Sequence, residues 1–161
     1  MAKRIRIDRY LTSDPRIRMV FEFSVIVVVG ILGEIFSWKK LPLSPYSNIF
    51  GGIIFVLAWR FHEYCHKFHR EAHQRSEAIK EVVTQGVFSK IRHPMYLSLI
   101  VMEFGMAIAW GIVWMFIPVI VSSILTIWTA LREEQVLLEK FGKQYEDYMK
   151  KVPWRMIPKV F

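Results

Sequence analysis

The residues best suited to chemistry lie in two short segments on either side of a long uncharged stretch. The first segment, residues 86–96, contains Arg92, His93 and Tyr96. Because Pro94 suits the first turn of a helix, we expect His93 to cap a helix and Tyr96 to lie one turn inside it. A helix start offers free backbone N–H groups, and the arginine adds a charged fork, so this segment can bind an anionic group. Anchoring of the arginine and tyrosine at a membrane interface is the alternative interpretation.

The second segment begins with Arg132, Glu133 and Glu134 and continues with apolar residues at helical spacing up to Gly142. We expect one helix to run from the preceding apolar stretch to a C-cap at Gly142. Adjacent side chains on a helix point about 100° apart, so one carboxylate can face a pocket while the other meets a neighbouring helix or water. A solvated charged turn after a membrane span is the alternative interpretation.

The stretch between these segments indicates a membrane. Residues 93–131 are 39 consecutive residues whose one formal charge is Glu103, in a chain of 161 residues with 22 Lys and Arg and 14 Asp and Glu. A helix needs about 20 apolar residues to cross a bilayer, so this stretch can cross and return as a tight helical hairpin. An intramembrane carboxyl is costly, and we expect Glu103 to be protonated, to bond another helix through Ser122, Ser123 or Thr126, or to line a substrate path.

Four membrane helices can be drawn along the chain. Their predicted limits are Met19–Trp38, about Ile49–Phe61, Met95–Ala109 and Ile112–Leu131, with Trp110 and Gly111 in the last turn. Six Lys and Arg lie in residues 1–18, seven in 60–92 and seven in 132–161, but two in 39–46 and none around Gly111. The positive-inside rule therefore places both termini and the central loop in the cytoplasm.

The predicted fold class is an all-α integral membrane protein with about four transmembrane helices, a C-terminal helical hairpin and a cytoplasmic amphipathic tail. Residues 1–161 form a single membrane domain in this prediction, and we expect a prokaryotic cell membrane as its host. The net charge of +8 is explained by anionic lipid headgroups, because the basic residues lie beside apolar spans rather than among aromatics that could stack on nucleic acid. The single cysteine, Cys65, excludes an internal disulfide.

A stripe of histidines raises the question of metal binding. His62, His66, His69 and His73 are spaced to lie along one face of a helix that continues the second span. Two imidazoles one turn apart can share an ion, but four extend over about 16 Å and cannot reach the same one. We therefore predict no metal site and expect a polar face at the headgroup layer or cytoplasmic mouth, with a pocket-lining role open for His62 or His66. A metal-handling membrane protein is kept as the alternative from another functional class.

The spacing within and between the two segments follows a family pattern. Residues 86–96 read GVFSKIRHPMY, residues 133–148 read EEQVLLEKFGKQYEDY, and Val152-Pro153 follows. Together these motifs resemble the isoprenylcysteine carboxyl methyltransferase family and the related phospholipid N-methyltransferases. The resemblance covers about residues 80–158, which we treat as a methyltransferase-like core.

The resemblance implies an integral membrane enzyme that binds S-adenosylmethionine at its cytosolic mouth. The cofactor-binding residues that it nominates are Arg92, His93, Pro94, Tyr96, Glu133 and Glu134, of which Arg92, Glu133 and Glu134 are the implied catalytic residues. It implies carboxyl methylation of a lipophilic acceptor, such as a prenylated cysteine or a similar thiol acid. A phospholipid amine N-methyltransferase is the alternative, and such an acceptor must lose a proton, to Glu133, Glu134 or His93.

This sequence departs from the family at three positions. Phe88 stands for the usual tyrosine, and Ser98 for the glycine two residues after Tyr96. The arginine expected one turn before Glu133, where a substrate carboxylate would dock, is Thr129. The identity of the methyl acceptor is therefore left open by the sequence.

Overall fold

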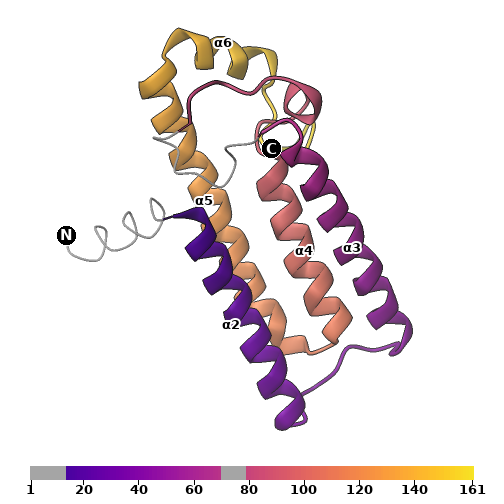
Figure 1. The fold of residues 1–161 in the computed structure, drawn as a ribbon. Coiled ribbons are helices and arrows are strands. Elements are labelled where there is room, and N and C mark those ends of the chain that lie inside the picture. The colour runs from indigo at the N-terminus through magenta and orange to yellow at the C-terminus, as the bar shows by residue number, and fades with distance from the viewer. Residues whose placement is uncertain (1–13, 70–78) are drawn as a thin grey trace, which may run out of the picture.

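The computed structural model describes residues 14–69 and 79–161, which form an all-α bundle (Figure 1). The described part contains five α-helices and two short 3-10 helices. These are α2 (Pro15–Ile35), α3 (Tyr46–His66), η2 (Gly86–Ser89), α4 (Pro94–Trp110), η3 (Val113–Met115), α5 (Phe116–Phe141) and α6 (Lys143–Lys151). Figure 1 shows α2 lying along α5 and α3 beside α4, with α6 folded over the end of the bundle where α4 begins. The predicted all-α class is confirmed.

The first two predicted helices exist but are placed differently. Helix α2 starts at Pro15, four residues before the predicted limit, because the Asp14 carboxylate accepts a hydrogen bond from the Arg16 backbone N–H at 2.9 Å and proline occupies the first turn. Helix α3 begins at Tyr46 and ends at His66, so it exceeds the predicted segment at both ends. Capping and turn geometry, rather than hydrophobicity, set these limits.

The last two predicted helices are reproduced closely. His93 is the N-cap of α4 and Pro94 its first residue, as predicted, and Gly111 ends the helix with φ at 82°. Helix α5 begins at Phe116, after η3, and continues without a break to Phe141. Gly142 follows it with φ at 52°, which confirms the predicted C-cap.

The histidine stripe does not continue along one helix, and that prediction is wrong. Helix α3 ends at His66, and His69 lies beyond it, where its ring contacts Phe88 edge-on at 5.6 Å. The Lys67 and Phe68 backbone N–H groups donate to the carbonyls three residues before them, so the helix ends in a tightened turn, and Phe68 packs against Cys65 and Phe88. His73 lies outside the described residues.

The closest helix packing is between α3 and α4, rather than within the predicted tight hairpin of α4 and α5. Two glycines make it possible. A Cβ atom at Gly51 would overlap the Ala109 backbone nitrogen, and one at Gly105 would lie 2.7 Å from the Phe55 backbone nitrogen. Small residues of this kind let helix backbones approach each other closely.

The surface of the bundle is apolar while its interior holds acidic and hydroxyl groups. The exposed large hydrophobic residues include Ile17, Phe21, Val28 and Ile35 of α2, Ile49, Ile53 and Leu57 of α3, and Ile117, Ile120, Ile124 and Trp128 of α5. Glu22, Glu103, Ser122 and Thr126 are buried. Among the described helices, Val113–Phe141 is long and apolar enough to cross a membrane by length and composition, and Pro94–Trp110 is apolar but shorter. The arrangement with four crossings stays a prediction.

The end of the bundle opposite α6 is closed. The Leu41 backbone N–H donates to the Gly111 carbonyl at 2.7 Å, and Val113 N–H donates to the Lys39 carbonyl at 3.0 Å. Beneath this contact, a core of Ile26, Ala107, Ile112, Met115 and Val119 is almost fully buried. Both candidate motifs lie at the other end.

Candidate active site

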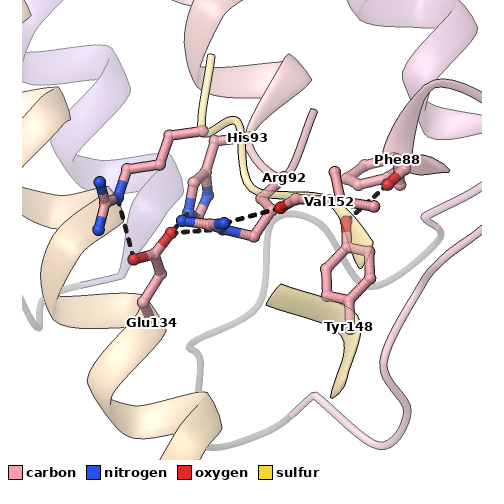
Figure 2. Close-up of polar contacts among 7 residues, drawn as sticks. Phe88, Arg92, His93, Glu134, Tyr148 and Val152 are labelled. Atoms are coloured by element: carbon pink, nitrogen blue, oxygen red, sulfur yellow. Dashed lines mark hydrogen bonds and ion pairs between the residues drawn. The ribbon is translucent and has the colours of Figure 1, made fainter. Parts of the chain in front are cut away.

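The two sequence motifs meet at one carboxylate, Glu134 (Figure 2). Its Oε1 accepts hydrogen bonds from Arg92 Nε at 2.8 Å and from His93 Nε2 at 3.1 Å. Its Oε2 accepts one from Arg155 Nε at 3.0 Å. Glu134, Arg92 and His93 are all buried, so this cluster joins the start of α4, the last turns of α5 and the C-terminal segment. The predicted meeting of the two motifs is confirmed.

Residues 152–155 hold the first motif in place through the backbone. The backbone N–H groups of Arg92 and His93 donate to the carbonyls of Trp154 at 2.9 Å and Arg155 at 2.7 Å. Arg92 also donates from Nη1 to the Val152 carbonyl at 2.7 Å. Its guanidinium therefore has partners on two sides, which fixes its orientation.

The aromatic residues of α6 anchor that helix over the site. The Tyr148 hydroxyl donates to the Phe88 carbonyl at 2.7 Å, as Figure 2 shows. Tyr145 and Tyr148 are buried with Ile79, Leu137 and Val152, while the charged residues of α6 face outward. Burial raises the pKa of both phenols, so each is a neutral hydrogen-bond donor. The predicted amphipathic tail is thus present as α6.

Glu134 lies beyond the uncharged part of α5, which ends at Leu131, and it is ionised. Burial acts to raise the pKa of its carboxyl. The hydrogen bonds and charges of His93 and Arg92 outweigh this effect and lower that pKa from 4.5 to about 2. The Glu134 carboxylate therefore keeps its charge throughout the physiological pH range.

A pocket of about 890 Å³, measured with its open mouth, lies beside the cluster. Four predicted site residues line it: Arg92, His93, Tyr96 and Glu133. Pro94 and Glu134 are buried without being among the lining residues. The two adjacent glutamates therefore face different ways, as predicted, with Glu133 toward the pocket and Glu134 toward the cations. Direct cofactor contact by Pro94 and Glu134 stays a prediction.

Helix α2 contributes groups to the pocket that the sequence motifs do not include. Arg18 and Glu22 line it, and Arg18 Nε lies 3.8 Å from Glu22 Oε1 with both side chains buried. The Tyr96 hydroxyl interacts with both Glu133 and Arg18. Three helices thus meet at Tyr96.

The sequence signals for the additional site residues are weak. Arg18 and Glu22 are an i, i+4 pair at the start of the first span, which is also common on solvated helix surfaces. Arg155 follows the Val-Pro of the family pattern by two residues, and its pairing with Glu134 could have been proposed from that position. Arg132, by contrast, is exposed and bonds Gln135, as expected for a residue facing elsewhere.

His62 lies in the wall of the pocket and bonds one of the departures from the family pattern. Its Nδ1 is 2.7 Å from Ser98 Oγ, and the Ser98 hydroxyl donates to the Met95 carbonyl at 2.6 Å. Because the serine proton is used in that bond, the imidazole donates from Nδ1. Across residues 14–69 and 79–161, no group of three or more His, Cys, Asp and Glu is placed to hold a metal ion.

Replacing Ser98 with alanine should lower the free energy of unfolding by about 1–3 kcal/mol, because the buried His62 N–H loses its acceptor. Ser89→Ala is the matched control, since the exposed Ser89 hydroxyl bonds only the Gly86 carbonyl of its own turn. Thermal or denaturant unfolding in detergent measures both variants. Equal stability of the two would show that the His62–Ser98 bond contributes nothing.

Comparison with known proteins supports the phospholipid methyltransferases, one of the two related groups that the motifs resemble. Residues 48–144, more than half of the chain, match the family model described as phospholipid methyltransferase. The matched region contains α4, α5, the first motif and the adjacent glutamates of the second, but it ends before Tyr145, Tyr148 and Arg155.

Several sterol reductases are also similar to this chain. The Delta(14)-sterol reductase TM7SF2 of Mus musculus is 29% identical over 84 residues, which cover 51% of this chain and 20% of the reductase. A probable 7-dehydrocholesterol reductase of Acanthamoeba polyphaga mimivirus is 27% identical over 156 residues, covering 94% of this chain and 32% of that protein. This chain therefore spans a third or less of the length of these relatives. The family model covers more than half of this chain, and the two motifs meet at one pocket. The chain therefore belongs to the phospholipid methyltransferase family.

Proposed function

We propose that this protein is an S-adenosylmethionine-dependent membrane methyltransferase that methylates the amine headgroup of a membrane lipid. The family supports a membrane methyltransferase that uses this cofactor. The acceptor is our inference, and the charge of the pocket wall is the observation that carries it.

The side chains that line the pocket fit the chemistry of the cofactor. Arg92 and His93 supply donors for the amino-acid carboxylate, while Glu133 supplies an acceptor for the ammonium or the ribose hydroxyls. Tyr96 adds a hydroxyl beside Glu133. When bound, the cofactor supplies an electrophilic methyl group on a sulfonium, and the role of the protein is alignment and exclusion of water.

The charges of the pocket wall favour a cationic acceptor over a carboxylate. Three carboxylates, Glu22, Glu81 and Glu133, line the pocket together with two arginines, Arg18 and Arg92. Both arginines already have a carboxylate partner, at 3.8 Å and 2.8 Å respectively. Because the cofactor carboxylate takes the remaining donors of Arg92, an acceptor carboxylate would have to displace Glu22 from Arg18, whereas a protonated amine is attracted to an acidic wall.

The position where a substrate carboxylate would dock holds no cation. Thr129 replaces the expected arginine, is buried, and donates its hydroxyl to the Leu125 carbonyl of its own helix at 2.9 Å. Its hydrogen-bonding capacity is thus directed at the backbone. We therefore prefer the amine acceptor to the prenylated thiol acid that the motifs alone suggest.

The distribution of polar groups supports insertion of the bundle in a bilayer with four crossings. Large apolar side chains cover the outside of α2, α3 and α5, while Glu22 and Glu103 are buried. Val113–Phe141 has 29 residues, or about 43 Å of helix, so its last turns can extend beyond about 30 Å of hydrocarbon. In this placement the cofactor enters from the cytosol, and the lipid acceptor reaches Leu99 and Thr126 in the deeper wall from between the helices.

Calorimetry with S-adenosylhomocysteine tests the cofactor assignment. We expect saturable binding by the purified protein in detergent, and threefold to tenfold weaker binding by Tyr96→Phe, about the loss of one hydrogen bond. Tyr64→Phe is the matched control, because Tyr64 lies on exposed α3 surface away from the pocket wall. Folded protein that gives no heat at near-millimolar ligand would contradict the methyltransferase assignment.

The acceptor is tested by incubation with a labelled methyl donor in nanodiscs. Phosphatidylethanolamine should be labelled, and a prenylated cysteine analogue should not. Labelling of the thiol acid alone would favour the carboxyl methyltransferase suggested by the motifs.

A reductase is the second candidate function, because the curated relatives described above are sterol reductases. A reductase needs a hydride donor, so NADPH is the discriminating ligand. Binding of NADPH without binding of S-adenosylhomocysteine would support that function instead.

A further inference from the structure

Glu103, near the middle of α4, has a buried carboxyl group of which one oxygen accepts a hydrogen bond. Its side chain is 2% exposed, and its Oε1 accepts a hydrogen bond from Ser122 Oγ at 2.7 Å. Among the residues that the structure describes, Oε2 has no hydrogen-bond partner. An unpaired polar atom in a protein interior is costly, and an intramembrane acid is functional by default. Oε2 is therefore available to a proton or a ligand.

Glu22 connects this carboxyl to the pocket. It lines the pocket wall and lies close enough to Glu103 for their charges to interact. Leu99, one turn before Glu103, and Thr126, one turn after Ser122, also line the pocket. Glu103 therefore lies about one helical turn beyond the pocket wall, behind Glu22.

Glu134 and His93 are not available as proton acceptors, because both already take part in the hydrogen bonds of the cluster. Glu134 accepts hydrogen bonds from two arginines and His93, so accepting a proton would disrupt the cluster. His93 donates Nε2–H to Glu134 and has no lone pair to offer from that nitrogen. Of the acids that the motifs nominate, Glu133 is left, and it interacts with the Tyr96 hydroxyl at the mouth.

Several other ionisable groups face the acidic pair from the surrounding helices. Arg18 of α2 pairs with Glu22, His62 of α3 lies in the pocket wall, and Tyr96 of α4 and Glu133 of α5 lie toward the mouth. Arg18 compensates one negative charge beside the pair. Two carboxylates beside one cation leave one negative charge uncompensated, so the pair can take up one proton as an ammonium group approaches.

We propose that Glu22 and Glu103 form a proton-accepting pair that converts the acceptor ammonium into the nucleophilic amine. This inference rests on the amine acceptor of the proposed function. An N–H bond of the ammonium breaks and its proton passes to Glu22, which transfers a proton to Oε2 of Glu103. The nitrogen lone pair then forms an N–C bond to the methyl group while the C–S bond breaks, with its electron pair going to sulfur. The products are a methylated ammonium and S-adenosylhomocysteine, and the stored proton returns to water through the mouth.

Glu103→Gln tests the proposal through the pH profile of methyl transfer to phosphatidylethanolamine in nanodiscs. We expect kcat at pH 7 to fall by about 10²–10⁴-fold, the usual contribution of a general base. The remaining rate should rise about tenfold per pH unit, because the fraction of free amine then depends on bulk pH. Binding of S-adenosylhomocysteine should stay within twofold of wild type, which shows that the pocket is intact.

Two matched controls are available in the chain. Glu34→Gln removes an exposed carboxylate of α2 that pairs with Lys40 at the closed end, and it should leave kcat unchanged. Ser122→Ala removes the hydrogen bond to Glu103 and should lower kcat. Ser123→Ala, whose hydroxyl bonds the Val119 carbonyl of its own helix, should not.

Infrared difference spectroscopy provides a readout that does not need turnover. Adding dodecylamine to protein saturated with S-adenosylhomocysteine should produce a protonated-carboxyl band that is missing in Glu103→Gln. Absence of this band in the wild type, or a wild-type pH profile for Glu103→Gln, would overturn the pair. The pair would also be overturned if Glu133→Gln, rather than Glu103→Gln, lowered kcat and removed the band. The proposed function fails separately, if the wild type binds S-adenosylhomocysteine but labels no amine lipid.

Discussion

Glu134→Gln should weaken S-adenosylhomocysteine binding by about tenfold to 100-fold and lower the free energy of unfolding by about 3–5 kcal/mol. Glutamine keeps the shape of the side chain but removes the charge that pairs with Arg92, His93 and Arg155. The buried guanidinium of Arg92 is then uncompensated, and removing one partner of a buried pair is strongly destabilising. Because Arg92 and His93 line the pocket, a shift in their positions also weakens ligand binding.

Glu139→Gln is the control for this experiment, since Glu139 is exposed on the same helix. Calorimetry measures binding, and unfolding in detergent measures stability. A Glu134→Gln protein that resembles Glu139→Gln in both would show that the cation cluster positions nothing.

The effect of Glu134 on stability should depend on pH in a defined window. The folded-state pKa of its carboxyl is lowered from 4.5 to about 2 by His93 and Arg92, although burial acts in the opposite direction. Its stabilising contribution is therefore complete above about pH 5 and is lost as pH falls toward 2. The stability difference between wild type and Glu134→Gln should shrink over the same interval, and a constant difference would contradict the ion-pair explanation.

Gly51→Ala should destabilise the bundle by about 1–3 kcal/mol or more, because the new methyl group has no space. It would overlap the Ala109 backbone nitrogen and lie 2.6 Å from the Ile108 carbonyl carbon. Backbone atoms cannot move aside as a flexible side chain can, so α3 and α4 must separate. The bond between His62 and Ser98, which joins these helices, should weaken as well.

The neighbouring glycine provides the matched control. A Cβ atom at Gly52 would meet nothing within 4 Å, so Gly52→Ala should be neutral or stabilise the protein by up to about 1 kcal/mol. Unfolding in detergent compares the two variants directly. Equal stability of Gly51→Ala and Gly52→Ala would mean that the close approach of α3 and α4 is not required.

The limits of helices were predictable where a local signal is strong. His93-Pro94 and Gly111 set the ends of α4 to within a residue of the prediction, and Gly142 sets the end of α5. The start of α2 was missed because the cap by Asp14 lies among charged residues, outside the apolar run. The histidine spacing was misleading because side-chain periodicity does not show where a helix ends, and α3 ends at His66.

The candidate site was predictable in its motifs but not in its full composition. The sequence nominated Arg92, His93 and the adjacent glutamates, and the structure brings them together. Arg155 contacts Glu134, and Arg18 contacts Tyr96 from a segment distant in the sequence. Both contacts depend on how the helices pack. Contacts of this kind leave no periodic pattern in a sequence.

By itself, the sequence determined the all-α class and the apolar hairpin segment, because periodicity and hydrophobicity dictate them. Its resemblance to a family predicted that residues 86–96 and the adjacent glutamates act together. Only the tertiary structure decided that Glu133 faces the pocket while Glu134 binds Arg92, His93 and Arg155. It also decided that Ser122, rather than Ser123 or Thr126, bonds Glu103. A helical sequence fixes the angle between neighbouring side chains, but the rotation of each helix in the bundle depends on the packing of all of them.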